Sequence, residues 1–372
     1  MSRQPTIFIT SFFGLIARNI LSTSVLRILQ EKNWRIVIFA PIEKEELYRR
    51  LFGGENVAVE GVSESRPSFR ERISTSLFLN ASDTRSRSIH RLVEFRKSRD
   101  YLRFVLHWFL AKLGHHRSFR KILRWVDYHF WVKSRFHHYF LKYRPNLVFV
   151  TDIYEPLDVA LVREARRRGV FTVGMIRSWD NMTTKGLNRF IPDKLAVNSE
   201  SVKREAVFYG DAYPENVSVV GVPHYDRYTS EKRTSKAEVF RQLKLDPSKP
   251  TVFFAPPSDI YSKNNLVSSQ VIKALSQLDV QLIVRPYIVG KVDLNGIEAV
   301  PNKIAIDKPE TSSSFREAEL TLGDKHLADL LYHSDVVLAF ASTLAIDSIV
   351  FGKPVIFIAF DDRPDRPYWE SL

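Results

Sequence analysis

The chain has 372 residues, 44% of them hydrophobic, and a formal net charge of +13 at pH 7. This length suits two domains, each with its own apolar core. The absence of cysteine excludes disulfides, thiolate catalysis and cysteine-based metal sites.

No apolar run approaches the roughly 20 residues that a membrane-spanning helix needs. The first residues, Met-Ser-Arg-Gln-Pro, run directly into an apolar strand rather than into the core of a signal peptide. We therefore expect a cytoplasmic protein, either free or peripheral on the inner face of the plasma membrane.

Strands and helices alternate through the first part of the chain. Apolar runs predict strands at Thr6–Ser11, Arg35–Ala40, Val57–Val62, Leu147–Thr151, Phe171–Ile176, Lys194–Asn198 and Val217–Val222. Apolar periodicity predicts helices at Asn19–Lys32, Ile42–Phe52, Pro156–Arg168 and Ser201–Tyr209. This alternation is typical of a parallel, doubly wound sheet, and we interpret residues 1–227 as one Rossmann-like domain.

The net positive charge of the chain is concentrated in the segment 85–144. This segment holds 16 Lys and Arg against three acidic residues, a balance equal to the net charge of the whole chain. Two helices fit the segment, broken near Gly114. In the second helix one stripe is cationic and aromatic, and includes Arg117, Lys121, Arg124, Tyr128, Trp131 and Arg135.

Two interpretations of this basic segment stay open. Cations mixed with Trp and Tyr suit the headgroup layer of an anionic membrane. Alternatively, these are ordinary surface helices whose aromatic residues belong to the core and whose cations are solvated. No nucleic-acid-binding motif accompanies the charge, which argues against a nucleic acid partner.

A polar loop, residues 177–186, directly follows a predicted strand and therefore opens at the carboxyl edge of the first sheet. We interpret it as an acceptor-side loop, with contacts from Arg177, Ser178, Trp179, Asn181 and Lys185. Asp180 is a candidate base for an attacking hydroxyl. The alternatives are an Asx-turn at Asp180 and a packing role for Trp179.

The best linker is the polar stretch Asp226–Lys236. Just before it, His224 is a candidate catalytic or phosphate-binding residue, with a structural role as the alternative. His326 and His333 are expected to face solvent. Adjacent histidines, as in His115-His116, point apart on a helix, so we expect no obligatory metal cofactor.

After the linker the strand pattern restarts at Thr251–Ala255, Gln281–Arg285 and Lys303–Asp307, which predicts a second Rossmann-like domain over residues 228–372. Arg285 ends a strand and could neutralise a diphosphate bidentately. Pro257 and Ser258 follow another strand and are expected to line the same site. In each case the alternative is a residue that merely ends a strand.

The last part of the chain predicts a parallel βαβ unit, with strands at Val336–Phe340 and Val355–Phe360. Ser342 or Thr343 would cap the helix between them, so that its free N–H groups point out of the carboxyl edge of the sheet. Phosphate binds at such places in α/β proteins. Asp347, one turn further on, would take a hydroxyl of the phosphate-bearing ligand.

Three segments carry a family resemblance: residues 324–361, Arg177-Ser-Trp-Asp-Asn-Met-Thr-Thr-Lys-Gly186, and Val220-Gly-Val-Pro-His-Tyr-Asp226. Together they resemble the CDP-glycerol glycerophosphotransferase group, GT-B glycosyltransferases and UDP-N-acetylglucosamine 2-epimerase-like proteins. The resemblance implies an α/β fold of two Rossmann-like domains facing a cleft.

The sequence departs from that group in two ways. In the resembling transferases a histidine next to a proline contacts the donor phosphates, whereas here Tyr287 stands at the expected position. Such proteins also finish with helices that cross back onto the first domain. This sequence stops a dozen residues after its last predicted strand, so we expect those crossing helices to be short or missing.

The resemblance implies a metal-independent transferase. It would move a sugar or polyol phosphate from a nucleotide-sugar or CDP-polyol donor to a surface-polysaccharide or lipid-linked acceptor. The alternatives are a UDP-N-acetylglucosamine 2-epimerase-like enzyme and a catalytically inactive GT-B binding module. The sequence identifies neither the nucleotide base, the transferred group, the acceptor nor the stereochemical outcome.

Overall fold

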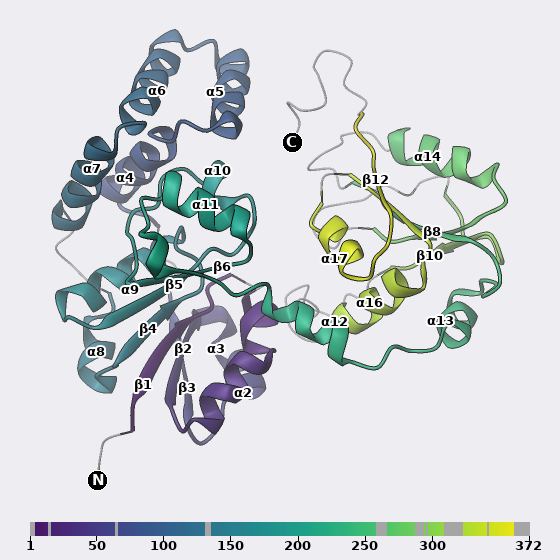
Figure 1. Ribbon diagram of the computed structural model, residues 1–372, viewed down its shortest axis with the longest axis horizontal. Coiled ribbons are helices and arrows are strands. Elements are labelled where there is room, and N and C mark those ends of the chain that lie inside the picture. The colour runs from purple at the N-terminus through teal and green to yellow at the C-terminus, as the bar shows by residue number, and fades with distance from the viewer. Residues whose placement is uncertain are drawn as a thin grey trace. The chain divides into compact units, whose positions relative to one another are not determined.

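The computed structural model describes residues 4–13, 16–63, 66–130, 135–257, 266–286, 294, 297–308, 323–340 and 342–360. The chain divides into two compact units, Met1–Pro223 and His224–Leu372. The boundary predicted after residue 227 falls inside the short helix α12 (Asp226–Ser230). Figure 1 shows the elements of each unit.

The first unit is built on a seven-stranded parallel sheet with the order β3-β2-β1-β4-β5-β6-β7. The strands are β1 (Thr6–Thr10), β2 (Arg35–Pro41), β3 (Val57–Val62), β4 (Leu147–Val150), β5 (Phe171–Met175), β6 (Lys194–Val197) and β7 (Val217–Val219). All five residues of β1 are buried, as expected for a central parallel strand that is covered on both faces.

Helices cover both faces of this sheet. On one face Phe8 and Val148 pack with residues of α8 (His137–Tyr143) and α9 (Pro156–Arg167). On the other face Met175 packs with η1 (Ala17–Leu21) and α2 (Ser24–Glu31). Apart from the helices between β3 and β4, the unit also has η2 (Ile42–Lys44), α3 (Glu45–Phe52), α10 (Asn181–Thr184), α11 (Glu200–Phe208) and η3 (Pro214–Asn216), and η4 (Pro223–Tyr225) crosses the boundary to the second unit.

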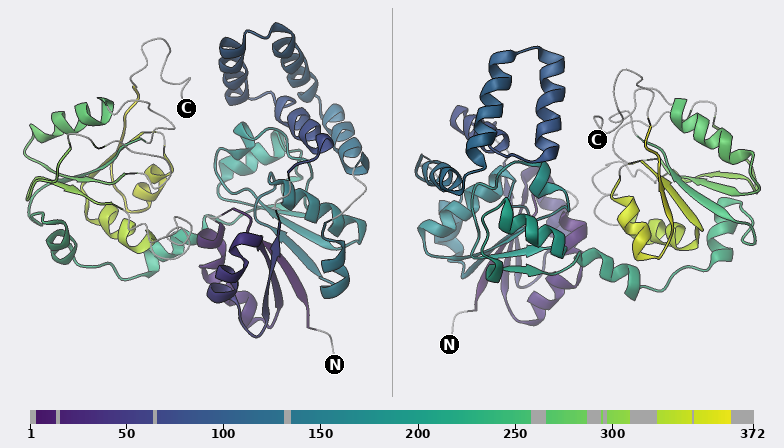
Figure 2. Two further views of the ribbon diagram at one scale, coloured as in Figure 1. Left: turned by 180° about the vertical axis from the view of Figure 1, so that it is seen from behind. Right: turned by 45° about the horizontal axis from the view of Figure 1, so that its top comes forward.

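Five helices lie between β3 and β4, and we call them the helical insert. They are α4 (Phe69–Asn80), α5 (Arg85–Ser98), α6 (Tyr101–Gly114), α7 (Arg117–Phe130) and α8. The prediction of two helices over 85–144 is therefore wrong, because the chain turns sharply at Arg99, whose φ of 56° is left-handed, as well as near Gly114. Helices α5 and α6 form a hairpin that extends away from the sheet (Figures 1 and 2).

Two glycines allow unusually close packing against the last turn of α4. A Cβ atom on Gly114, at the end of α6, would lie 1.7 Å from the carbonyl oxygen of Ala81. Gly186 has a left-handed φ of 88°, and its Cβ would lie 2.6 Å from Cα of Leu79. Leu187 N–H also donates to the carbonyl of Phe78 at 2.9 Å. The end of α4 is thus held between the end of α6 and the loop that follows α10.

A buried carboxylate fixes α7 to the rest of the first unit. Asp127 accepts hydrogen bonds from Arg163 of α9, from Arg189 at 2.9 Å and from Ser74 of α4. Burial raises the pKa of Asp127, but the hydrogen bond and charge of Arg189 and the charge of Arg163 outweigh burial and hold the pKa below its usual value. The side chain is therefore ionised and ties together segments far apart in the sequence.

The second unit is built on a five-stranded parallel sheet with the order β10-β9-β8-β11-β12. The strands are β8 (Thr251–Ala255), β9 (Gln281–Val284), β10 (Ile304–Ile306), β11 (Val336–Ala339) and β12 (Val355–Phe357). One face carries α13 (Lys236–Leu243) and α16 (Gly323–His333), and the other carries α14 (Leu266–Ser276). Helix α17 (Leu344–Val350) connects β11 to β12.

The predicted elements differ from the structure mainly at their ends. Helix 19–32 is interrupted at Ser22 and Thr23, where the Thr23 hydroxyl accepts from Val25 N–H and starts α2. The predicted linker is partly helical, since α12 occupies its first half. The prediction of short or missing crossing helices concerns residues 361–372, which lie outside the described residues.

Asp127→Asn should destabilise the protein at pH 7 by about 3–5 kcal/mol, because it leaves two buried arginines without their carboxylate. Since the pKa of Asp127 is lowered in the folded state, its contribution is present above about pH 4 and is lost as the pH falls through the lowered pKa. Urea titrations at pH 7 and at lower pH measure both effects.

The matched control is Asp100→Asn. Asp100 caps α6 by accepting from Arg103 N–H, and asparagine caps equally well, so the free energy of unfolding should change by less than about 0.5 kcal/mol. Equal effects of the two substitutions would contradict the role given to Asp127.

Candidate functional site

The strand order of the second unit reverses between β8 and β11, and α/β proteins bind ligands at such a switch point, outside the carboxyl ends of the strands. Ala255 pairs with Ala339 at the ends of these strands. The next residues on the two sides are the Pro256-Pro257 pair and, beyond Phe340, Ser342. Pro257 and Ser342 therefore lie at the predicted edge, whereas Ser258 is outside the described residues.

The start of α17 follows the prediction only in part. Ser342 Oγ accepts a hydrogen bond from Leu344 N–H at 3.2 Å, while the Thr343 side chain makes no capping bond. Both residues are exposed. Of the two candidate caps, Ser342 acts at the helix start, and the Thr343 hydroxyl is left facing solvent.

Asp347 and His224, which the sequence assigned to different parts of the site, come together in the second unit. The nearest His224 Nε2 to Asp347 Oδ1 distance is 3.8 Å. Tyr228 of α12 donates from its hydroxyl to the same Asp347 oxygen at 3.1 Å. His224 is 4% exposed, and among the described residues neither ring nitrogen has a hydrogen-bond partner. A buried imidazole beside a carboxylate is an arrangement suited to proton transfer.

Arg285 belongs to a second polar cluster at the same edge of the sheet. Its guanidinium donates to Asp307, which follows β10, and His326 of α16 contacts the other Asp307 oxygen at 2.8 Å. Burial raises the pKa of Asp307, but the hydrogen bond from His326 and the charge of Arg285 outweigh burial and leave the pKa below its usual value. Arg285 is thus already paired with a carboxylate.

Both histidine predictions in α16 need correction. His326 is held by Asp307, and the ring of His333 contacts the carbonyl of Thr234 at 2.6 Å. Neither ring simply faces solvent. Tyr287 lies outside the described residues.

The first unit also has a switch point, between β1 and β4, and a charged pair lies there. Asp152 lies two residues beyond the end of β4, and its Oδ2 lies 3.1 Å from Nε of Arg177. The Arg177 guanidinium also stacks 3.8 Å above the ring of Phe13, which follows β1. Burial raises the pKa of Asp152 despite the opposing charge of Arg177. Asp152 is fully buried and so positions Arg177 instead of meeting a ligand.

Asp180 precedes α10, and its carboxylate is engaged locally. It accepts hydrogen bonds from the hydroxyls of Ser178 and, at 3.2 Å, Thr184. Trp179 is 54% exposed, so it does not pack into the core. Lys185 is exposed, whereas Asn181 is buried and its Nδ2 has no partner among the described residues. The loop therefore presents Trp179 and Lys185 outward, above a buried polar layer.

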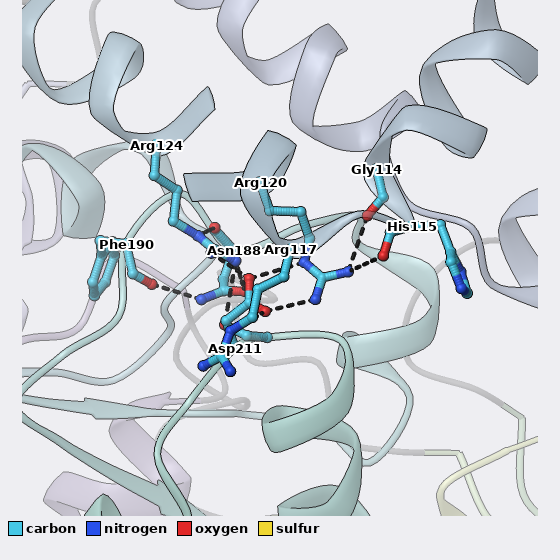
Figure 3. Close-up of polar contacts among 9 residues, drawn as sticks. Gly114, His115, Arg117, Arg120, Arg124, Asn188, Phe190 and Asp211 are labelled. Carbon is cyan, nitrogen blue, oxygen red and sulfur yellow. Dashed lines mark hydrogen bonds and ion pairs between the residues drawn. The ribbon is translucent and has the colours of Figure 1, made fainter. Parts of the chain in front are cut away.

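The predicted membrane stripe of α7 is wrong in part, as Figure 3 shows. Arg124 points inward, and donates to Asp211 at 2.6 Å and to the carbonyl of Asn188 at 2.9 Å. Arg117 and Lys121 are exposed, and exposed Arg135 donates weakly to the Ser63 carbonyl. Trp131 lies outside the described residues.

Large apolar side chains are also exposed on α6 and α7. On α6, Leu102 is 82% exposed, and Val105, Leu106 and Phe109 are each more than half exposed. These positions follow the i, i+3, i+4, i+7 spacing of a single helix face. On α7, Ile122 and Trp125 are also more than half exposed. None of the helices in the described part of the chain is long and apolar enough to cross a bilayer.

Several residues of these clusters were missed in the sequence. Asp152 and Asp307 each stand at the carboxyl end of a predicted strand, and that position could have identified them. Tyr228 carried no such signal, because it was assigned to a linker. Within the described ranges, no three His, Asp or Glu side chains gather as metal ligands would.

Comparison with known proteins identifies the fold. Neither a protein-family model nor a curated protein matches the sequence. Among solved structures, a UDP-N-acetylglucosamine 2-epimerase matches with a TM-score of 0.53 and 11% identity, covering 98% of this chain and 81% of its own. The UDP-GlcNAc 2-epimerase from Methanocaldococcus jannaschii matches with a TM-score of 0.51 and 13% identity over 97% and 86% of the two chains.

The glycotransferase of kitacinnamycin has a TM-score of 0.50 at 10% identity, over 99% of this chain and 84% of that chain. Identities this low establish only the fold. The predicted fold class, an α/β protein with two Rossmann-like domains of the GT-B type, is confirmed.

Proposed function

We propose that this protein is an enzyme that uses a nucleotide-activated sugar or polyol phosphate as donor and transfers the activated group to a surface-polysaccharide or lipid-linked acceptor. The observation that carries the proposal is the group of Ser342, Asp347, Tyr228 and His224 beside the switch point of the second sheet. The likeness to proteins named as glycosyltransferases and UDP-GlcNAc 2-epimerases supports a nucleotide-sugar donor.

In this proposal each unit has its own role. In the second unit, Ser342, Thr343 and Asp347 bind the donor near Pro257. The sequence-based prediction for Ser258 concerns a residue outside the described ranges. Arg285, which is shared with Asp307, contributes the remaining N–H groups of its guanidinium to the leaving diphosphate. In the first unit, the loop of Arg177, Ser178, Trp179, Asn181 and Lys185 receives the acceptor. The charge of the leaving group is stabilised by protein donors, with no obligatory metal.

The His224–Asp347 and His326–Asp307 pairs favour one second candidate, an enzyme resembling the UDP-GlcNAc 2-epimerases. That reaction needs carboxylates and a histidine around the sugar. NMR spectroscopy of UDP-GlcNAc incubated with the protein, without any acceptor, separates the two functions. Loss of the glucosamine stereochemistry at C2 would identify the epimerase. The third possibility, an inactive binding module, would turn over no activated sugar.

We also propose a peripheral position on the inner face of an anionic membrane. The exposed apolar stripe of α6 supports this position, and exposed cations precede the stripe in the chain at Lys97 and Arg99 and follow it at Lys112. Apolar side chains at the headgroup boundary flanked by cations are typical of interfacial helices. The cations predicted on α7 support this position less strongly, because Arg124 is paired with Asp211 inside the protein.

The donor site can be tested with Asp347→Ala. Calorimetric titration against UDP-, CDP-, GDP- and ADP-linked donors should identify one nucleotide class, and the substitution should weaken its binding by about 1–3 kcal/mol, or roughly five- to 150-fold. Tyr228→Phe removes only the hydroxyl that donates to Asp347 and keeps the carboxylate, so it should weaken donor binding less than Asp347→Ala does. If Asp347→Ala binds the donor like the parent protein, Asp347 is not a donor contact.

The base can be tested with Asp180→Asn, which keeps the shape and much of the local hydrogen bonding of the loop. If Asp180 deprotonates the acceptor, turnover should fall by about 10² to 10⁴ while donor affinity stays nearly unchanged. A purely local role for the carboxylate predicts a change in melting temperature with turnover preserved. In that case His224 becomes the residue to substitute.

The membrane position can be tested with the double substitution Leu102→Ser and Phe109→Ser. Partitioning onto phosphatidylglycerol-containing vesicles should fall by at least about tenfold, because two large apolar side chains no longer enter the interface. Ile42→Ser, which changes a half-exposed residue away from the insert, is the control. Unchanged flotation of the double variant would rule out this face.

A further inference from the structure

The first unit contains a cavity of about 760 Å³ that lies between the start of α7 and helix α11. None of the residues assigned above to donor binding or catalysis lines it. Its volume falls within the range of small-molecule sites. Four cations line it, Arg117, Arg120, Lys203 and Arg204, against two acidic residues, Glu200 and Asp211.

The floor of the cavity is a preorganised ionic cluster, shown in Figure 3. Arg120 donates to both Asp211 oxygens, at 2.8 and 2.6 Å, and to the carbonyls of Gly114 and His115. Arg124 donates to the same carboxylate. Asp211 itself has a left-handed φ of 59°, a backbone strain that functional sites often retain. Two arginines thus share one carboxylate, which leaves the floor with an excess of positive charge.

The rim adds cations whose donors are still available. Arg117 reaches Asp211 only through Nε, at 3.4 Å, and its side chain is 53% exposed. Arg204 is exposed and donates from Nη2 to Ser201, which leaves its other N–H groups for a ligand. Lys203 lies beside it on α11. A concave site with an excess of positive charge attracts anions, and guanidinium groups match the oxygens of phosphate.

The cavity also has an apolar wall. Phe208, at the end of α11, is 63% exposed although it lines the cavity, and Val207 and Pro214 lie beside it. Inorganic phosphate would leave this wall uncovered. A ligand that carries both a phosphate and an apolar group would satisfy the cations and cover Phe208.

We propose that this cavity binds an anionic phosphate ester with an apolar portion. The phosphate contacts Arg117, Lys203 and Arg204, and the apolar portion lies on Phe208. Such chemistry is shared by the headgroup of a lipid phosphate and by a free phosphate ester. This site shares no residue with the proposed donor site, so an experiment can contradict one proposal without contradicting the other.

The test compares the full-length parent with the double variant Lys203→Gln, Arg204→Gln by calorimetric titration. The probes are dihexanoyl phosphatidic acid, glycerol 3-phosphate and inorganic phosphate. The parent should bind the phosphatidic acid, and the variant should bind it at least about tenfold more weakly, because hydrogen bonds between charged groups are lost. Phe208→Ser should weaken the binding of phosphatidic acid but leave the binding of inorganic phosphate unchanged.

The control variant, Arg27→Gln with Lys32→Gln, removes two exposed cations elsewhere in the same unit and should bind like the parent. Tighter binding of phosphatidic acid than of glycerol 3-phosphate would support the apolar contact at Phe208, and equal binding of the two would overturn that part of the proposal. No binding by the parent, or equal affinities of the parent and the Lys203, Arg204 variant, would overturn the proposal. The affinity for nucleotide donors, measured in parallel, tests the proposed donor site of the second unit separately.

Discussion

The helical insert depends on two buried carboxylates that each hold two arginines. Asp127 binds Arg163 and Arg189, and Asp211 binds Arg120 and Arg124. A buried guanidinium without a carboxylate is strongly unfavourable, so these pairs determine which side of α7 faces inward. The orientation of α7 also sets the position of α6, which directly precedes it, and with it the exposed apolar stripe and the cationic cavity.

The two sheets repeat one design, with the strand order reversing next to the first strand of each unit. In both units charged side chains pair near the carboxyl ends of the strands, but the chemistry differs. The first unit places an arginine between a buried aspartate and an aromatic ring, at Arg177. The second places histidines against carboxylates, at His224 and His326. The first arrangement suits holding a ligand, and the second also suits moving a proton.

The sequence predicts the sheets well and the insert poorly, for physical reasons. A buried parallel strand is a short apolar run, such as Gln281–Val284, and it is recognisable without knowing its neighbours. For α7, periodicity reveals two stripes but not which of them faces inward. That choice depends on Asp211, Arg163 and Arg189, which lie 36 or more positions away from their partners in the chain. An arginine stripe was therefore assigned to the outside.

In the candidate site, too, some residues could be predicted from the sequence and others could not. Ser342 and Asp347 were predicted from the rule that ligands bind at the carboxyl ends of parallel strands. In the structure Ser342 lies just beyond β11 and Asp347 lies in the first turn of α17. Their surroundings did not follow, because Tyr228 and His224 reach Asp347 from a segment more than a hundred residues earlier. The pairing of Arg285 with Asp307 likewise joins two strand ends whose adjacency only the sheet order reveals.

The close packing at Gly114 and Gly186 has a mechanical consequence. Both glycines contact the last turn of α4, and the Thr84 hydroxyl, which caps α5, also donates to the carbonyl of Thr183 in the loop 177–186. There is no slack at these contacts, because backbone meets backbone. We therefore expect the end of α6 and the loop that carries Asp180 to keep a fixed position relative to the end of α4, because a shift at either contact would bring backbone atoms into collision.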